Sequence, residues 1–306
     1  MRIRSGLLRL GVILMLAASG SWAQAFDVFS PLPSSAPIPI DNPQTVGKIA
    51  LGKQLFSDNR LSVNRSVSCN HCHALSNAGA DPRVRSLGAL GKQPRRSTPT
   101  LLNAAFQSVQ FWDGGAVSLE SAITVHLMDA TVMGNPDEAS VATRISARKN
   151  YRKLFSAAFD GQEIATVDHI AKALAAYVRI LITPDSPFDR YLQGDTTALT
   201  ADARRGFEEF QKVGCSACHF GINLSGPPMP MGEGFYELFP NYLGSKYDRK
   251  YNLVTDDLGR YEVTREDIHK RLFRVSTLRN IALTAPYFHT GSVATLNEAV
   301  RVMAKT

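Results

Sequence analysis

Cys69-Asn70-His71-Cys72-His73 and Cys215-Ser216-Ala217-Cys218-His219 are two copies of the pattern Cys-X-X-Cys-His, and they contain all four cysteines of the 306-residue chain. Two cysteines three positions apart can each form a thioether to a haem vinyl group, which leaves the following imidazole under the iron. The pattern therefore predicts two covalently bound c-type haems. The attachment residues would be Cys69, Cys72, Cys215 and Cys218, and the proximal iron ligands His73 and His219.

Two other uses of these cysteines are open to test. A zinc ion could take the four thiolates, but zinc gives no reason for a histidine directly after each pair. A redox disulfide usually occurs as one Cys-X-X-Cys pair beside a βαβ pattern, and the sequence around both pairs lacks that pattern. Both alternatives explain less of the pattern than haem attachment does.

Residues 1–25 have the features of a secretory signal peptide. Three arginines precede a short apolar run at 11–18, and the small residues Ala23-Gln24-Ala25 follow it. The run is too short to span a bilayer, and the flanking residues are typical of cleavage before Phe26. No later stretch of about 20 apolar residues suggests a membrane span. Because haem c is attached outside the bacterial inner membrane, the signal and the motifs together predict a periplasmic protein.

About 280 residues remain after the expected cleavage, enough for two domains. The motifs begin 146 residues apart (215 − 69), which predicts one haem in each domain. A Pro-Asp-Ser-Pro run at 184–187 marks the expected boundary, with domains at 26–185 and 186–306. The formal charge is +7 including the signal arginines, and there is no dense basic run. This balance argues against nucleic acid as a partner.

Apolar spacing predicts helices and gives no alternating strands. Helices are expected at 46–56, from 167 to about 181, and after Thr200 up to Gly214. Residues 74–100 are rich in Gly, Pro and Arg, which predicts a long loop around the first haem. The predicted fold class is mainly α, and no internal repeat is apparent beyond the two haem motifs.

Several stretches around the motifs, taken together, resemble the bacterial di-haem cytochrome c peroxidase family, which includes the di-haem oxidases that mature methylamine dehydrogenase. They occur in the family's order over nearly all of the expected mature chain. The matching stretches are Leu51-Gly52-Lys53-Gln54-Leu55-Phe56, Arg60-Leu61-Ser62, Pro99-Thr100-Leu101-Leu102-Asn103-Ala104, Phe111-Trp112-Asp113-Gly114, Ser186-Pro187-Phe188-Asp189-Arg190-Tyr191-Leu192, Leu278-Arg279-Asn280 and Pro286-Tyr287-Phe288-His289.

The resemblance implies two cytochrome c-like helical domains packed face to face, with one covalent haem c in each. The N-terminal haem would receive hydrogen peroxide. The C-terminal haem would accept electrons from a small periplasmic donor protein, a cytochrome c or a cupredoxin. Family members are often dimers, so the resemblance also implies a homodimer.

By position, Met303 matches the methionine that ligates the C-terminal haem in the family, fourteen residues after His289. A thioether opposite histidine raises the haem potential, which suits an electron-entry site. Two competitors, Met229 and Met231, lie in a Gly/Pro-rich loop of the kind that can present a thioether to iron. Met303 is also close to the end of the sequence, where fraying is common, and an ordinary core methionine on a helix is the alternative to the ligand interpretation.

Trp112 matches the tryptophan between the two haems of the family, where a π-system can carry an electron or a hole. Tryptophans are also common packing residues, so a structural role is the alternative. Thr284 and Pro286 match positions that offer backbone carbonyls to a calcium ion between the domains. The companion asparagine of the family is Ser97 here, which puts the calcium site in doubt.

The distal catalytic groups of the family are missing from this chain. Val132 and Ala122 replace the glutamate and glutamine, and Ala89 replaces the histidine that blocks the peroxide-binding haem at rest, so this iron is expected to be open. His126 follows Ala122 by one helical turn, where the family often has a proline, and is the candidate replacement for peroxide acid–base chemistry. Glu120 and Asp129 are nearby alternatives.

The sequence therefore predicts a periplasmic di-haem oxidoreductase that reduces hydrogen peroxide to water, with altered activity. One alternative is a di-haem electron carrier or sensor without peroxidase turnover, which the missing glutamate favours. Another is a di-haem oxidase that modifies a partner protein. The methylamine-dehydrogenase-maturing relatives use tyrosine at the position of Met303, which counts against that last alternative.

Overall fold

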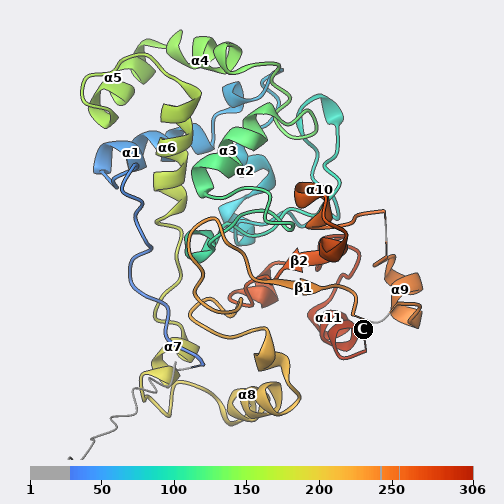
Figure 1. The fold of residues 1–306 in the computed structure, drawn as a ribbon. Coiled ribbons are helices and arrows are strands. Elements are labelled where there is room, and N and C mark those ends of the chain that lie inside the picture. The colour runs from blue at the N-terminus through green and yellow to red at the C-terminus, as the bar shows by residue number, and fades with distance from the viewer. Residues whose placement is uncertain (1–27, 242, 255, 306) are drawn as a thin grey trace, which may run out of the picture.

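The computed structural model describes residues 28–241, 243–254 and 256–305, so the expected signal peptide and its cleavage site lie outside the described part. The chain is mainly helical, with one small sheet (Figure 1). The helices are α1 (Val46–Phe56), α2 (Cys69–Cys72), α3 (Leu119–Met128), α4 (Glu138–Ser146), α5 (Lys149–Ala158), α6 (Val167–Val178), α7 (Pro187–Leu192), α8 (Ala201–Lys212), α9 (Lys246–Tyr251), α10 (Tyr261–Thr264) and α11 (Leu296–Met303). Strands β1 (Tyr236–Leu238) and β2 (Leu272–Arg274) pair antiparallel.

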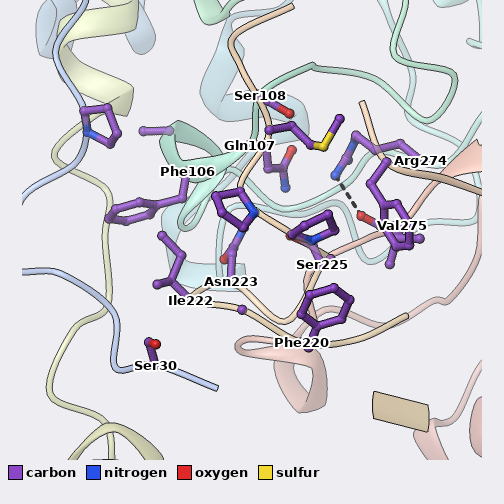
Figure 2. A pocket seen from close by; sticks show the side chains of 18 of the residues that line it. Ser30, Phe106, Gln107, Ser108, Phe220, Ile222, Asn223, Ser225, Arg274 and Val275 are labelled. Atoms are coloured by element: carbon purple, nitrogen blue, oxygen red, sulfur yellow. Dashed lines mark hydrogen bonds between the residues drawn. The ribbon is translucent and has the colours of Figure 1, made fainter. Parts of the chain in front are cut away.

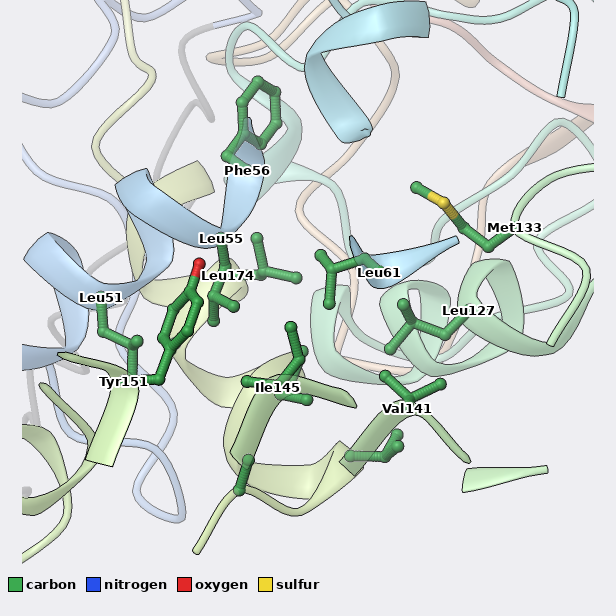
Figure 3. Close-up of a cluster of buried hydrophobic side chains, with 14 of the residues drawn as sticks. Leu51, Leu55, Phe56, Leu61, Leu127, Met133, Val141, Ile145, Tyr151 and Leu174 are labelled. Atoms are coloured by element: carbon green, nitrogen blue, oxygen red, sulfur yellow. The ribbon is translucent and has the colours of Figure 1, made fainter. Parts of the chain in front are cut away.

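Most of the buried apolar side chains lie in the N-terminal half, between α1, α4, α5 and α6 (Figure 3). Leu51, Leu55, Ile145 and Tyr151 are all fully buried there. Helices α1 and α6 approach closely because Gly52 has no side chain: a Cβ at this position would lie 2.0 Å from the carbonyl oxygen of Ala173. This close packing positions the chain that leads from α1 into the first Cys-X-X-Cys-His motif.

The C-terminal half has a smaller apolar core around α9 and α11, with these buried members: Tyr251, Leu253, Tyr287, Val293, Ala299 and Val302. Helix α8 contributes no buried residue. Its Phe207 instead meets the rings of Phe29, Phe188 and Tyr191 edge to face, at centroid distances of 4.9, 5.1 and 6.3 Å. The C-terminal half therefore depends on an aromatic cluster to which the beginning of the described chain contributes Phe29.

Residues 28–32 cross to the C-terminal half and pack beside the second haem motif. The Gly221 N–H donates to the carbonyl oxygen of Val28 at 2.7 Å, and the Leu32 N–H donates to Asp189 Oδ1 at 2.8 Å. Asp189 also forms a buried ion pair with Arg279 at 2.8 Å. This segment therefore links α7 and the second motif to the start of α1.

The structure reveals an internal repeat that the sequence did not show. Two stretches, 97–126 and 274–303, follow the same course with an offset of 177 residues (280 − 103). Asn103 and Asn280 both take positive φ, 62° and 59°, directly before a 3₁₀ turn. Phe111 and Phe288 also share positive φ, 68° and 67°. An isolated antiparallel bridge follows in each stretch, Gln110–Ala116 and Tyr287–Val293, and then α3 or α11 begins after a Ser or Thr cap.

The two repeats contact each other through reciprocal bonds. The Ser97 N–H donates to the carbonyl oxygen of His289, and the Arg274 N–H donates to that of Trp112, both at 2.8 Å. Under the 177-residue offset these are the same bond made twice, because 97 corresponds to 274 and 112 to 289. Both Asn103 and Asn280 also donate through Nδ2 to Thr183 Oγ1, each at 2.9 Å. The repeats are therefore related by an approximate two-fold axis that passes close to these bonds.

The predicted helices at 46–56, in 167–181 and after Thr200 are confirmed as α1, α6 and α8. Thr45, Thr166 and Thr200 cap them by accepting a backbone N–H. The prediction of no internal repeat was wrong, because the repeat is carried by backbone conformation more than by residue identity. The two strands were not predicted either, since each has only three residues. None of the helices in the described ranges is both long enough and apolar enough to cross a bilayer.

Candidate haem sites

The first motif forms one helical turn that presents its three functional side chains together. In α2 the His73 N–H donates to the carbonyl oxygen of Cys69 at 2.9 Å, which closes the turn. His73 Nδ1 is 3.0 Å from the carbonyl oxygen of Gly79. Because that acceptor holds the proton on Nδ1, Nε2 is left with a lone pair for a metal. Burial lowers the pKa of His73, so the imidazole is neutral, as a metal ligand must be.

The second motif repeats this arrangement. The His219 N–H donates to the carbonyl oxygen of Cys215 at 3.0 Å, and His219 Nδ1 is 3.1 Å from the carbonyl oxygen of Leu224. Burial also lowers the pKa of His219. The two histidines therefore have the same orientation relative to their cysteines and the same kind of carbonyl partner. This is the geometry that a proximal haem ligand requires, and the residues present fit the group.

A cavity of about 800 Å³ lies beside the second motif (Figure 2). Its wall is mostly apolar and comes from four parts of the chain: the segment that starts at Val28, the loop 105–108, the loop 220–231, and the end of β2. Ser216 of the motif itself is part of the wall. A volume of this size falls in the range of cofactor pockets and suits a large planar group held at its edge by the motif.

Arg274 brings a buried positive charge to this cavity. Only 7 % of the residue is exposed, and its Nε donates to the carbonyl oxygen of Phe111 at 3.0 Å. Among the described residues no carboxylate lies within ion-pair distance of the guanidinium. Burial lowers the pKa of Arg274 to about 10. Burial of this cation is costly, and the charge of Asp113 offsets the cost only from beyond ion-pair distance, so the cavity suits a ligand that carries negative charge at this end.

His126 is on the last turn of α3, which is continuous through this position as the sequence analysis expected. Its ring packs against Phe111, with centroids 5.0 Å apart. Its Nδ1 is buried and has no hydrogen-bond partner among the described residues. Burial, and then the nearby imidazole of His73, lower the pKa of His126 to about 4. The fold therefore brings His126 and His73 into one neighbourhood, although 53 residues (126 − 73) separate them.

Glu120 and Asp129, the alternatives to His126, each hold other parts of the structure in place. Glu120 is occupied by Arg179 and by Asn42, whose Nδ2 donates to it at 2.7 Å. Asp129 Oδ1 accepts the Thr131 N–H at 2.6 Å and so caps the turn after α3. The Ala89 N–H donates to the carbonyl oxygen of Val132 at 2.7 Å, so these two positions lie next to each other. Both side chains there are apolar, as the sequence predicts.

Trp112 lies where the two repeats meet. Its Nε1–H donates to the carbonyl oxygen of Ser97 at 2.8 Å, and its ring meets His289 edge to face at 6.4 Å. His289 occupies the position of Trp112 in the second repeat and stacks on Phe273 at 4.1 Å. Its Nε2 is buried without a partner among the described residues, and burial lowers its pKa to about 4. Aromatic side chains from both halves are therefore in contact at the axis.

The three candidate methionines occupy different surroundings. Met229 and Met231 line the cavity beside the second motif. Met303 is the last residue of α11, 48 % exposed, and is not among the residues that line this cavity. Under the internal repeat, however, Met303 is the counterpart of His126. Its role as an iron ligand remains a prediction.

The positions expected around calcium come from two segments that touch. Ser97 is buried and bonds to the carbonyl of His289, just after the segment that contains Thr284 and Pro286. The Ser97 carbonyl is already taken by Trp112. Over 28–241, 243–254 and 256–305, no three side chains of His, Cys, Asp or Glu converge as metal ligands.

Comparison with known proteins identifies the family. The family described as di-haem cytochrome c peroxidase matches residues 46–197. The cytochrome c551 peroxidase of Pseudomonas aeruginosa is 38 % identical over 282 residues, which is 92 % of this chain and 78 % of that protein. The chain belongs to the di-haem cytochrome c peroxidase family. It is therefore an oxidoreductase of the peroxidase class, and the family implies haem as its cofactor.

Members named MauG or MauG-like are similar as well. The methylamine utilization protein MauG of Methylorubrum extorquens is 36 % identical over 272 residues, 88 % of this chain and 71 % of that protein. A solved structure described as a MauG-like protein associated with microbial copper homeostasis has a TM-score of 0.78 and 32 % identity, covering 90 % of this chain and 81 % of that one. The fold described above is thus that of the peroxidase and MauG branches of the family.

Sequence reasoning missed Arg274 and His289 as residues of the haem region. The signal that could have found them is the repeat, since Arg274 corresponds to Ser97 and His289 to Trp112. Only a few identities mark that repeat in the sequence, among them Thr100/Thr277, Leu101/Leu278, Asn103/Asn280 and Phe111/Phe288.

Proposed function

We propose that this protein is a periplasmic di-haem c peroxidase in which peroxide reacts at the His73 site and electrons enter at the His219 site. The observation that supports the proposal is that His126 lies within electrostatic range of His73: the Nδ1 of His73 is fixed by a carbonyl, and the Nδ1 of His126 is buried without a partner among the described residues. Haem iron bound at the two motifs would supply the electrons that break the peroxide O–O bond.

His126 is the side chain that moves the proton in this proposal. Its low pKa keeps it neutral near pH 7, so it can accept a proton from one peroxide oxygen and return it to the other. Ala122, one turn earlier on the same helix face, leaves room beside it because its side chain is a single methyl group. Val132 cannot share this task, so the site has one acid–base group where the family pattern has a carboxylate.

Each half of the chain would hold its own haem and its own iron ligands. One haem c would be attached at each motif, with domains at 26–185 and 186–306. Arg274 would hold a carboxylate of the second haem, and Trp112 would lie on the electron route between the two sites. Met303 would ligate the second iron, with Met229 and Met231 as competitors. A small cytochrome c or cupredoxin would be the electron donor. A calcium ion would bind near Ser97, Thr284 and Pro286, and the protein would form a homodimer.

The test is turnover of hydrogen peroxide by the haem-loaded protein with a reduced donor protein. We expect donor oxidation with two haem masses per chain, and a loss of about 10²- to 10⁴-fold in the peroxide rate for His126→Ala. Val132→Glu should raise the rate. His169→Ala, a histidine on α6, is the matched control and should change nothing. Slow, stoichiometric bleaching that is indifferent to both His126 and Val132 substitutions would refute peroxidase turnover.

The second candidate is a di-haem electron carrier or sensor, and the apolar side chain of Val132 favours it. An oxidase acting on a partner protein is the third, supported by the similarity to MauG. In that case peroxide would be consumed without a soluble donor, and the oxidised product would be a protein. Mass spectrometry of candidate partner proteins after the reaction separates this function from the first two.

A further inference from the structure

We propose that His126 binds the iron of the haem held by His73 as its sixth ligand at rest, so that the peroxide site is closed by an imidazole from α3. This inference rests on the proposed function for the identity of the group at the first motif. It changes the expectation from the sequence that this iron is open because Ala89 cannot supply a blocking histidine.

The internal repeat pairs His126 with a residue that is itself an expected iron ligand. His126 and Met303 are equivalent positions, each on the last turn of the helix that follows the antiparallel bridge, fourteen residues after Trp112 and His289 respectively. Histidine and methionine are the two side chains that most often complete a haem c iron opposite a proximal histidine. The two halves therefore carry an iron-binding side chain at the same place in the same backbone repeat.

The surroundings of His126 favour the same role. Its ring packs against Phe111, with centroids 5.0 Å apart, and its Nδ1 is buried without a hydrogen-bond partner among the described residues. A ring whose Nδ1 edge is buried directs Nε2 away from the protein wall. Ala122 lies one turn before His126 on the same face of α3, and its side chain is only a methyl group. It therefore does not block the space between His126 Nε2 and a planar group bound by His73.

The same geometry makes this ligand exchangeable. His73 and His219 each have a carbonyl partner for Nδ1, at 3.0 and 3.1 Å, whereas Nδ1 of His126 has none among the described residues. Removing such a partner typically weakens metal binding about 10- to 100-fold. Peroxide can therefore displace His126 from the iron, and the released imidazole is then beside the bound oxygen atoms, where the proposed proton transfer requires it.

The experiment is spectroscopy of the resting ferric, haem-loaded protein, which does not depend on turnover. We expect both haems to be low-spin by electron paramagnetic resonance and optical absorption. His126→Ala should convert one of the two haems to high spin, and added imidazole should restore low spin. Cyanide should bind that haem at least about 10-fold more tightly in the variant, because no internal ligand competes.

Two matched variants sharpen the result. His126→Met copies the second repeat and should give a second thioether-ligated haem, whereas His169→Ala should leave both spectra unchanged. Haem content and far-ultraviolet circular dichroism show that each variant is folded. A high-spin haem in the unmodified protein, or a low-spin spectrum that survives His126→Ala, overturns the ligation.

The two proposals fail separately. If the unmodified protein already has an open, high-spin haem but His126→Ala still slows the peroxide reaction, ligation is wrong and peroxidase function stands. If His126→Ala changes the spin state while peroxide never drives donor oxidation, the ligand is right and the peroxidase proposal is wrong.

Discussion

Residues 97–126 and 274–303 share one backbone course, but the two halves that contain them are stabilised differently. Around the first repeat, α1, α4, α5 and α6 enclose a large apolar core, and the segment after α3 packs back onto it through the Val63 N–H, which donates to the carbonyl of Met133 at 2.9 Å. Around the second repeat, the apolar core is smaller, and α11 ends at Met303. Figure 1 shows the first half above the second.

This difference indicates which half depends on its cofactor. A large core can hold its fold by apolar burial, at roughly 25 cal/mol per Å². Helix α8 has no buried residue, so the half that contains it has less apolar burial available. A bound haem should therefore add more to the stability of this half. Equal backbone geometry therefore does not imply equal stability in the two halves.

The largest expected effect comes from removing each haem in turn. We expect the double variant Cys215→Ser, Cys218→Ser to lose one haem mass and to leave 186–305 open to proteolysis, while α1 to α6 stay protected. The reciprocal variant Cys69→Ser, Cys72→Ser should lose one haem mass but keep its helical core. Limited proteolysis with intact-mass analysis measures both. Equal protection of the two halves in both variants would show that the smaller core is sufficient.

A smaller effect is expected from the buried ion pair between Asp189 and Arg279, which joins the segment 28–32 to the C-terminal half. Asp189→Ala leaves a guanidinium buried without its anion, which should lower the free energy of unfolding by about 3–5 kcal/mol. Glu209→Ala is the matched control, because its contact with Lys212, at 3.3 Å, is exposed and the position is helical. Chemical denaturation compares them, and similar losses for both would contradict the argument.

The ion pair between Asp189 and Arg279 also makes the free energy of unfolding depend on pH. Burial alone would raise the pKa of Asp189, but the bonds from Arg279 and from the Leu32 N–H outweigh burial and lower it. The folded pKa is then below the unfolded value of about 3.9. The stabilisation is therefore fully present above about pH 4 and is lost as the pH falls through the folded pKa. A denaturation series in acid should show Asp189→Ala converging on the unmodified protein.

The next largest loss of stability is expected from the two hydrogen bonds that the repeats donate to Thr183. Thr183→Val removes the acceptor of both Asn103 and Asn280, which should cost about 2–3 kcal/mol if each amide is left without a partner. Thr183→Ser keeps the oxygen and is the control. If the bonds tie the halves together, hydrogen exchange should speed up in both 3₁₀ turns after the asparagines. A change in one turn only would place Thr183 within a single half.

The sequence predicted the parts of the fold whose residues are neighbours in the chain. Both motifs, the helices with a clear apolar stripe and their Thr caps could be identified locally. Helices α4 and α5 were missed, although Val141/Ile145 and Tyr151/Phe155 are buried pairs at four-residue spacing. Other features depend on residues that are far apart in the chain, so no local pattern could reveal them. They are the proximity of His126 to His73, the buried charge of Arg274 and the bonds between the repeats.

The smallest loss of stability is expected when the N-terminal caps of the two equivalent helices, α3 and α11, are removed. Ser118 accepts the Ser121 N–H at 3.1 Å at the start of α3, and Thr295 accepts the Glu298 N–H at 3.3 Å at the start of α11. Replacing either by Ala should cost about 1 kcal/mol of stability. The two variants should differ in hydrogen exchange, because the segment after α3 packs back through the bond from Val63 N–H to the Met133 carbonyl, whereas Met303 at the end of α11 is 48 % exposed. Thr295→Ala should therefore fray α11 up to Met303, whereas Ser118→Ala should leave the turn with His126 protected. If both helices fray equally, the packing after α3 does not distinguish the two halves, and His126 has no better anchored position than Met303.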